Sequence, residues 1–156
     1  MDSMNRFHTD SSWRLVRVEL LIPFIGLLYL LLDFRNEVRW GLFLTIFALI
    51  DLIGYLPGTI AYRIAAKRRP GHLIQISPVF HYLYNISHSF LTATVVVGLW
   101  FLWNGDFELE MFALPLHLLG DRALFGNVYK PVSLPFEPTV AVMLPTVPGQ
   151  LKDRHP

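Results

Sequence analysis

Residues 38–55 of the chain read VRWGLFLTIFALIDLIGY. This run is strongly apolar and close to the roughly 20 residues that a helix needs to cross a lipid bilayer. Its inner part nevertheless contains Asp51. An ionisable side chain at such a depth is costly, and residues of this kind usually mark a functional site. The stretch therefore predicts a membrane-spanning helix that carries a polar group inside the bilayer.

Three further apolar stretches have a comparable length. We expect membrane spans at about residues 15–32, 38–55, 79–103 and 111–125, and the second could extend to Tyr62. The first has no cleavage site of small residues, so we interpret it as a retained signal anchor. A soluble helical bundle would need polar faces that these stretches lack. The predicted fold is all-α, a four-transmembrane-helix bundle.

The overall composition agrees with a membrane protein. Only 16% of the residues are charged, whereas soluble domains carry about 25%. The formal net charge is +1 and no basic patch is interleaved with aromatic residues, which argues against a nucleic-acid partner. The absence of cysteine excludes disulfides and thiolate metal sites. The lipid bilayer is therefore the partner that the composition predicts.

Charges in the connecting segments indicate an orientation. Arg14 and Arg17 lie at the start of the first span and residues 67–69 are all basic, whereas residues 104–110 contain three acidic residues and no basic one. By the positive-inside rule, both termini are expected in the cytoplasm, with the protein integral to the cell (inner) membrane. Aromatic side chains gather at membrane interfaces. Four tryptophans lie near the predicted span ends: Trp13, Trp40, Trp100 and Trp103.

The last part of the chain has a different character. Six of the eleven prolines fall within residues 131–156. Since proline interrupts helices, we expect a proline-rich, largely irregular C-terminal tail, whose apolar residues favour lying against the bundle or a partner. The predicted organisation is a cytoplasmic segment at 1–14, a four-span membrane domain at 15–130 and the tail at 131–156.

Four potential metal ligands recur at a similar predicted depth in three spans. His117 and Asp121 are four residues apart and therefore share one helix face. Two imidazoles and two carboxylates suit zinc, manganese or iron. A bound divalent ion would neutralise the carboxylates and could activate water for hydrolysis. The predicted metal-binding and catalytic residues are Asp51, His88, His117 and Asp121, with Tyr55, Asn85 and Arg122 as supporting or substrate-orienting groups.

Other functions remain compatible with these residues. Polar side chains in membrane bundles often only hydrogen-bond across helices. In that case the chain is a non-catalytic subunit or scaffold of a larger membrane complex or a homo-oligomer. A third alternative is proton or ion passage along His81, Asn85 and His88, which would share one stripe of a continuous helix.

Three sequence blocks carry a family resemblance. They are Asp51-Leu-Ile-Gly-Tyr55, Tyr84-Asn85-Ile-Ser-His88 and His117-Leu-Leu-Gly-Asp121-Arg122. Their order resembles a small bacterial integral-membrane family of unknown function, over about residues 15–130. The His-Ser and His-x-x-x-Asp elements are more distantly similar to membrane-bound metal-dependent hydrolases. The resemblance implies that His88, His117 and Asp121 are metal ligands with Asp51 as the fourth. The function that we expect is metal-dependent hydrolysis of a membrane-resident, lipid-like substrate, most simply an ester or phosphoester.

Overall fold

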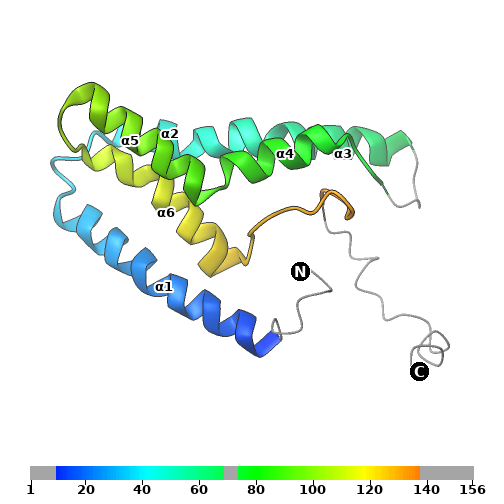
Figure 1. The fold of residues 1–156 in the computed structure, drawn as a ribbon, viewed down its shortest axis with the longest axis horizontal. Coiled ribbons are helices and arrows are strands. Elements are labelled where there is room, and N and C mark those ends of the chain that lie inside the picture. Colours follow the sequence, from blue (N-terminus) through cyan, green and yellow to red (C-terminus); the bar gives the residue numbers. More distant parts are fainter. Residues whose placement is uncertain (1–9, 69–73, 138–156) are drawn as a thin grey trace.

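The computed structural model describes residues 10–68 and 74–137, and within these two ranges it contains helices and no strands. The predicted all-α class is therefore confirmed (Figure 1). The elements are α1 (Asp10–Asp33), α2 (Trp40–Gly54), α3 (Leu56–Arg68), α4 (Pro78–Ser87), α5 (Phe90–Asn104), the short 3₁₀ turn η1 (Leu109–Phe112), α6 (Ala113–Gly120) and the π-helical turn η2 (Asp121–Phe125).

Two helical segments are long and apolar enough to cross a membrane. The first is α1 from Ser11 to Asp33, and the second runs through α2 and α3 over 29 residues. The second segment is interrupted only at Tyr55, which keeps right-handed helical angles. Pro57 explains the interruption, because it has no N–H to donate to the preceding helical turn. The second predicted span thus continues past Tyr62 to the end of α3.

The third predicted span is divided into two helices. α4 and α5 are bent by 55° relative to each other. The side chain of Ser89 accepts a hydrogen bond from the Leu91 N–H and so begins α5 as a new helix. His88 consequently lies at a helix end rather than on the continuous stripe with His81 and Asn85 that the sequence predicts. The bent pair would count as one span only if both helices cross the membrane together.

The region predicted as a fourth span is the innermost part of the molecule. It consists of η1, α6 and η2, and α6 has only 8 residues, so it is not among the helices long enough to cross a membrane alone. α6 contacts α1, α2 and α5 (Figure 1). Arg17 of α1 donates to the carbonyl of Ala123 at 3.0 Å and so ties η2 to α1. η2 ends at Gly126, whose φ of 74° favours glycine.

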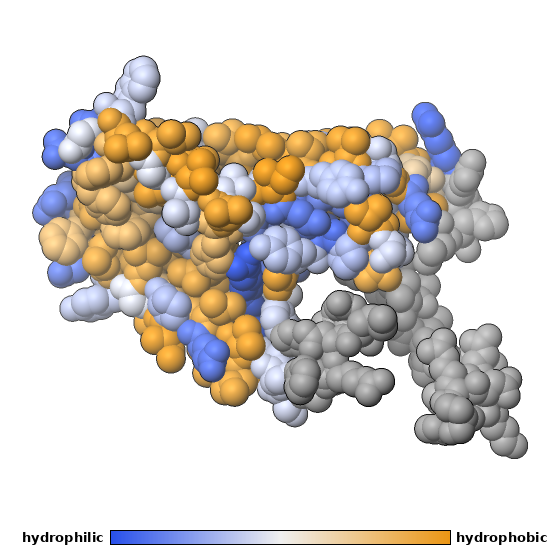
Figure 2. All heavy atoms as spheres, in the orientation of Figure 1, coloured by the Kyte–Doolittle hydropathy of each residue, from blue (hydrophilic) through white to orange (hydrophobic). Residues whose placement is uncertain are grey.

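Two apolar clusters hold α6 in place, and the outer helix faces remain apolar. One cluster joins Ala113 and Leu116 to α1 and α2, and the other joins Leu114 and Leu118 to α2 and α5. Figure 2 shows apolar surface over the outer helices and a hydrophilic area in the angle between α4 and the end of α6. Such a surface suits a protein surrounded by lipid, because lipid tails accept exposed apolar side chains.

The 127–137 segment has no regular helix and lies against α3 and α4. Phe136 is almost fully buried there, and a Cβ added to Gly58 would lie 2.2 Å from its ring. Glu137 accepts a hydrogen bond from Thr59 at 2.7 Å. The first part of the predicted tail therefore packs on the helices, and its remainder at 138–156 lies outside the described residues.

Candidate metal centre

Three of the predicted ligands converge from three helical elements. Asp51 is on α2, His88 follows the end of α4 and His117 is on α6. One ligand atom from each lies within 4.8 Å of the others. The Nε2 atoms of His88 and His117 are 3.3 Å and 3.7 Å from the same oxygen, Oδ1 of Asp51. The side chains of these three residues therefore meet in the folded chain.

Asp121 lies beside the same two imidazoles. Its Oδ2 is 3.5 Å from Nε2 of His88 and 3.7 Å from Nε2 of His117. Each Nε2 atom is thus close to two carboxylates, one from α2 and one from the first residue of η2. Asp121 is therefore next to the two imidazoles, although it is not one of the three residues whose ligand atoms all lie within 4.8 Å of one another.

The spacing of these atoms suits coordination of a small divalent ion. Zinc ligands of this type lie about 2.0–2.2 Å from the metal, which places two ligands of a tetrahedral site about 3.3–3.6 Å apart. The nitrogen–oxygen distances in the cluster are 3.3, 3.5, 3.7 and 3.7 Å. Most of these distances are too long for good hydrogen bonds. The geometry therefore resembles a ligand shell more closely than a hydrogen-bonded network.

His117 has an unusual environment. Only 5% of its surface is exposed, and its Nε2 makes no hydrogen bond to any residue that the structure describes. Its ring packs against Phe47 with centroids 4.6 Å apart. Buried polar atoms without partners are rare in native proteins and call for an explanation. A cation between the carboxylates would supply the missing partner of Nε2.

His88 is oriented by its neighbours. Its Nδ1 is 3.1 Å from the carbonyl of Tyr84 and 2.9 Å from Oγ of Ser87. A proton on Nδ1 would be donated to that carbonyl and leave the lone pair of Nε2 facing the carboxylates, the tautomer that a metal ligand requires. The ring of Tyr84 stacks on the imidazole at 3.9 Å. Tyr84 was not among the predicted site residues, and only its position in the Tyr-Asn-x-x-His block pointed to it.

Among the three predicted supporting residues, the described part of the chain shows a side-chain hydrogen bond to a ligand residue for Arg122. It donates to the carbonyl of His88 at 3.2 Å, and its guanidinium lies 4.2 Å from the centre of the Phe90 ring. Asn85 instead exchanges two hydrogen bonds with the backbone of Lys130, at 2.7 and 3.0 Å. Tyr55 stacks on Phe136 with centroids 6.2 Å apart. Asn85 and Tyr55 therefore hold the 127–137 segment in place.

Lys130 is a further residue that the sequence did not indicate. Its Nζ donates to the carbonyl of Phe136 at 2.6 Å and lies 5.1, 5.0 and 4.2 Å from the ring centres of Tyr55, Tyr84 and Phe136. Burial lowers the pKa of this lysine. His81 also belongs to this area, since its Nε2 is 3.2 Å from the carbonyl of Leu134. These contacts form a wall beside the cluster of potential metal ligands.

Comparisons with protein-family models, with curated proteins and with solved structures found no match for this chain. The resemblance to an integral-membrane family and to metal-dependent hydrolases therefore stays a prediction. The candidate site rests on its geometry alone: a buried pair of imidazoles between two carboxylates.

Proposed function

We propose that this chain is a four-span inner-membrane protein that binds a divalent metal ion and hydrolyses a lipid-like ester or phosphoester. The ligands are the two imidazoles and two carboxylates of the cluster. The observation that carries the proposal is His117, whose buried Nε2 faces Asp51 and Asp121 without a hydrogen bond to the described residues. A passive network would be expected to satisfy that nitrogen.

The ligand chemistry limits the metal and its use. Nitrogen and carboxylate oxygen ligands together suit zinc, manganese or iron. When bound, such an ion acts as a Lewis acid and lowers the pKa of a coordinated water. In the hydrolysis, water adds across the ester bond, so that one product gains the hydroxyl group and the other the hydrogen.

The ligands differ in exposure, which suggests different roles. The side chain of Asp51 is 50% exposed, that of Asp121 is 18% exposed, and both imidazoles are buried. Asp51 thus lies on the open side of the cluster, where water and substrate would approach. We assign to it the additional role of accepting the proton of the attacking water. Asp121 and the two histidines hold the ion from the closed side.

The proposed topology has α1, α2–α3 and α4–α5 as three spans and residues 111–125, which include α6 and η2, as the fourth. The fourth is the shortest, since Met111 to Phe125 rises about 21 Å at about 1.5 Å per residue, against a hydrocarbon core of about 30 Å. The basic end of α3 and the acidic residues around η1 support cytoplasmic termini. The resemblance to an integral-membrane family is part of the same proposal.

Metal content of the purified protein tests the proposal. We would measure it by elemental mass spectrometry after purification in mild detergent without chelators. His117→Ala and Asp121→Ala should lose a near-stoichiometric metal that the unchanged chain retains. His81→Ala is the matched control, because His81 is equally buried but lies in the wall rather than in the cluster. An unchanged chain without metal would overturn the proposal.

A non-catalytic membrane subunit or scaffold is the second candidate function. The observation in its favour is the surface of α1, where Leu15, Ile22 and Tyr29 are 60%, 71% and 71% exposed. A partner helix or a second copy could cover this face as well as lipid could. A stable stoichiometric partner after purification from native membranes, together with absent metal, would favour this function over hydrolysis.

A further inference from the structure

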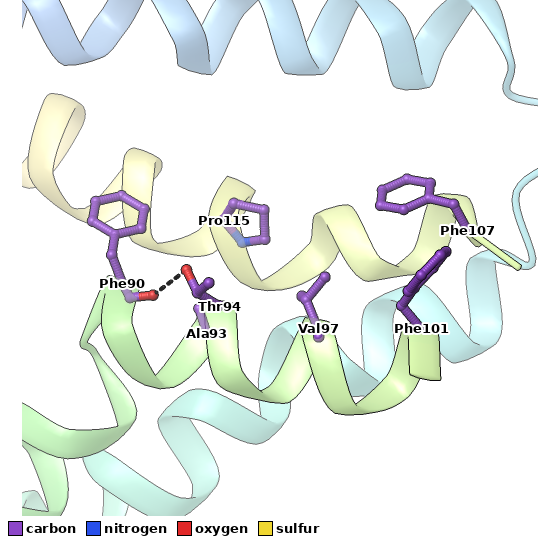
Figure 3. A pocket seen from close by; sticks show the side chains of 8 residues that line it. Phe90, Ala93, Thr94, Val97, Phe101, Phe107 and Pro115 are labelled. Carbon is purple, nitrogen blue, oxygen red and sulfur yellow. Dashed lines mark hydrogen bonds between the residues drawn. The ribbon is translucent and has the colours of Figure 1, made fainter. Parts of the chain in front are cut away.

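A groove lies between α5 and α6 (Figure 3). Its volume is about 480 Å³. Phe90 and Phe101 of α5 lie at its two ends, while Pro115 of α6 and Phe107 complete its walls. Leu91 and Leu102 on the same helix are 75% and 77% exposed. The groove therefore lies on a surface that lipid would cover in a membrane.

The groove offers almost no hydrogen-bonding group to an occupant. Its lining contains one polar side chain, Thr94, whose hydroxyl already donates to the carbonyl of Phe90 at 2.8 Å (Figure 3). A polar occupant would lose its hydrogen bonds to water without replacement. A hydrocarbon chain loses none, so the lining selects for an apolar occupant.

The length of the groove suits one acyl chain. From Phe90 to Phe101, α5 rises about 16 Å at about 1.5 Å per residue. This is about half of the roughly 30 Å hydrocarbon core of a bilayer. A chain that fills one leaflet would therefore extend along most of the groove.

Charge gives the groove a direction. Arg122 stacks on Phe90 at one end and donates to the carbonyl of His88, and within residues 10–68 and 74–137 it forms no ion pair. Beyond Phe107, at the other end, Glu108 lies 2.8 Å from Arg39 and accepts from Trp100. An anionic head group would be attracted to Arg122 at the first end, whereas Arg39 at the second end is already paired with Glu108.

We propose that this groove binds one hydrocarbon chain of an anionic lipid, with the anionic head group at Arg122 beside the metal cluster. As a statement about substrate class it rests on the proposed function, since it names the lipid to be hydrolysed. As a statement about binding it is measurable without any reaction. His88, which precedes Phe90 by two residues, connects the head-group end to the cluster.

Gly98 provides a way to fill the groove. A Cβ added there would meet no atom within 4 Å, and Gly98 lines the groove, so Gly98→Phe adds a ring at the groove. Gly26 on α1 is the matched control, because a Cβ added there also meets no atom within 4 Å. Both variants add the same side chain to an open helix surface, but only the first occupies the groove.

The experiment uses a photoactivatable lipid. The full chain is reconstituted in phosphatidylcholine vesicles with a trace of phosphatidic acid that carries a diazirine midway along one acyl chain. After illumination, labelled peptides are mapped by mass spectrometry, beside the same diazirine on phosphatidylcholine. We expect labelling of residues 90–107 by the anionic probe to fall about tenfold or more in Gly98→Phe and to stay unchanged in Gly26→Phe. Arg122→Gln should remove the preference for the anionic probe.

The same preparations are analysed for metal, which separates the two proposals. Equal labelling of Gly98→Phe and the unchanged chain would overturn the groove proposal, whatever the metal content. Groove labelling with the expected variant pattern in a chain without metal would uphold the lipid site and overturn the metal-dependent hydrolase. Equal labelling by both probes, unaffected by Arg122→Gln, would overturn the assignment of the head group.

Discussion

Oδ1 of Asp51 lies 3.3 Å from Nε2 of His88, although the two residues are 37 positions apart in the chain. The contact exists because α2 packs closely against the end of α4. Gly54 makes this approach possible, since a Cβ added there would lie 1.9 Å from Oγ of Ser87 and 3.1 Å from Nδ1 of His88. One glycine on α2 therefore sets the distance between two of the proposed ligands.

Gly54→Ala should separate α2 from the end of α4. We expect a loss of about 1–3 kcal/mol in the free energy of unfolding, typical of an overpacked contact, and a loss of bound metal. Thermal unfolding in detergent and metal content measure the two effects. Gly41→Ala on the same helix is the control, because a Cβ there meets no atom within 4 Å. It should be neutral or slightly stabilising, and equal behaviour of both variants would contradict the packing argument.

The helices could be predicted from the sequence because they follow from hydropathy along the chain. The convergence of Asp51, His88 and His117 could not, since depth does not fix the rotation of each helix about its axis. The break after His88 was also missed. A serine that begins a new helix inside an apolar run carries no hydropathy signal, and here Ser89 is that residue.

The sequence predicts Asn85 and Tyr55 as supporting groups of the metal site, whereas in the structure their side chains contact the 127–137 segment. Sequence spacing places both near the ligands, but it does not reveal that Phe136 and Lys130 fold back onto α3 and α4. Their contacts span 45 residues or more in the chain, as between Asn85 and Lys130. Contacts of this range depend on the tertiary packing of an irregular segment, which neither periodicity nor composition encodes.

Asn85 gives a prediction that distinguishes a packing role from a substrate role. Its amide both donates to and accepts from the backbone of Lys130. Asn85→Ala removes both hydrogen bonds, and we expect a cost of about 1–3 kcal/mol with faster hydrogen exchange in the 127–137 segment. Metal content should be unchanged. Unaltered exchange together with lost metal would assign Asn85 to the metal site instead.

The pair formed by Glu110 and Arg39 predicts a pH dependence of stability. Glu110 is buried, and Arg39 donates to it at 3.0 Å, which holds the pKa of the carboxyl below its usual value of 4.5. A lowered pKa means that the unfolded state binds the proton more tightly. The stabilisation is therefore complete above about pH 4.5 and is lost as the pH falls further, through the pKa of the folded state.

Glu110→Gln should remove this pH dependence and lower the free energy of unfolding at neutral pH by about 1.5–3 kcal/mol, as for hydrogen bonds to charged groups. Unfolding temperatures in detergent between pH 3 and pH 7 measure both effects. Glu37→Gln is the control, because Glu37 is exposed in the connection between α1 and α2 that also carries Arg39. The ion pair would have no part in stability if the pH profile of Glu110→Gln matched that of the unchanged chain.

Substitutions of Tyr84 should change metal affinity by degrees, although Tyr84 is not itself a proposed ligand. Its ring stacks on His88 at 3.9 Å with an interplanar angle of 16°, so it limits rotation of the imidazole. Tyr84→Leu should weaken metal binding about 10–100-fold, the range found when support of a ligand is removed, whereas Tyr84→Phe keeps the ring and should bind normally. Competition with a chromogenic chelator measures both affinities. Equal affinities would show that stacking does not position His88.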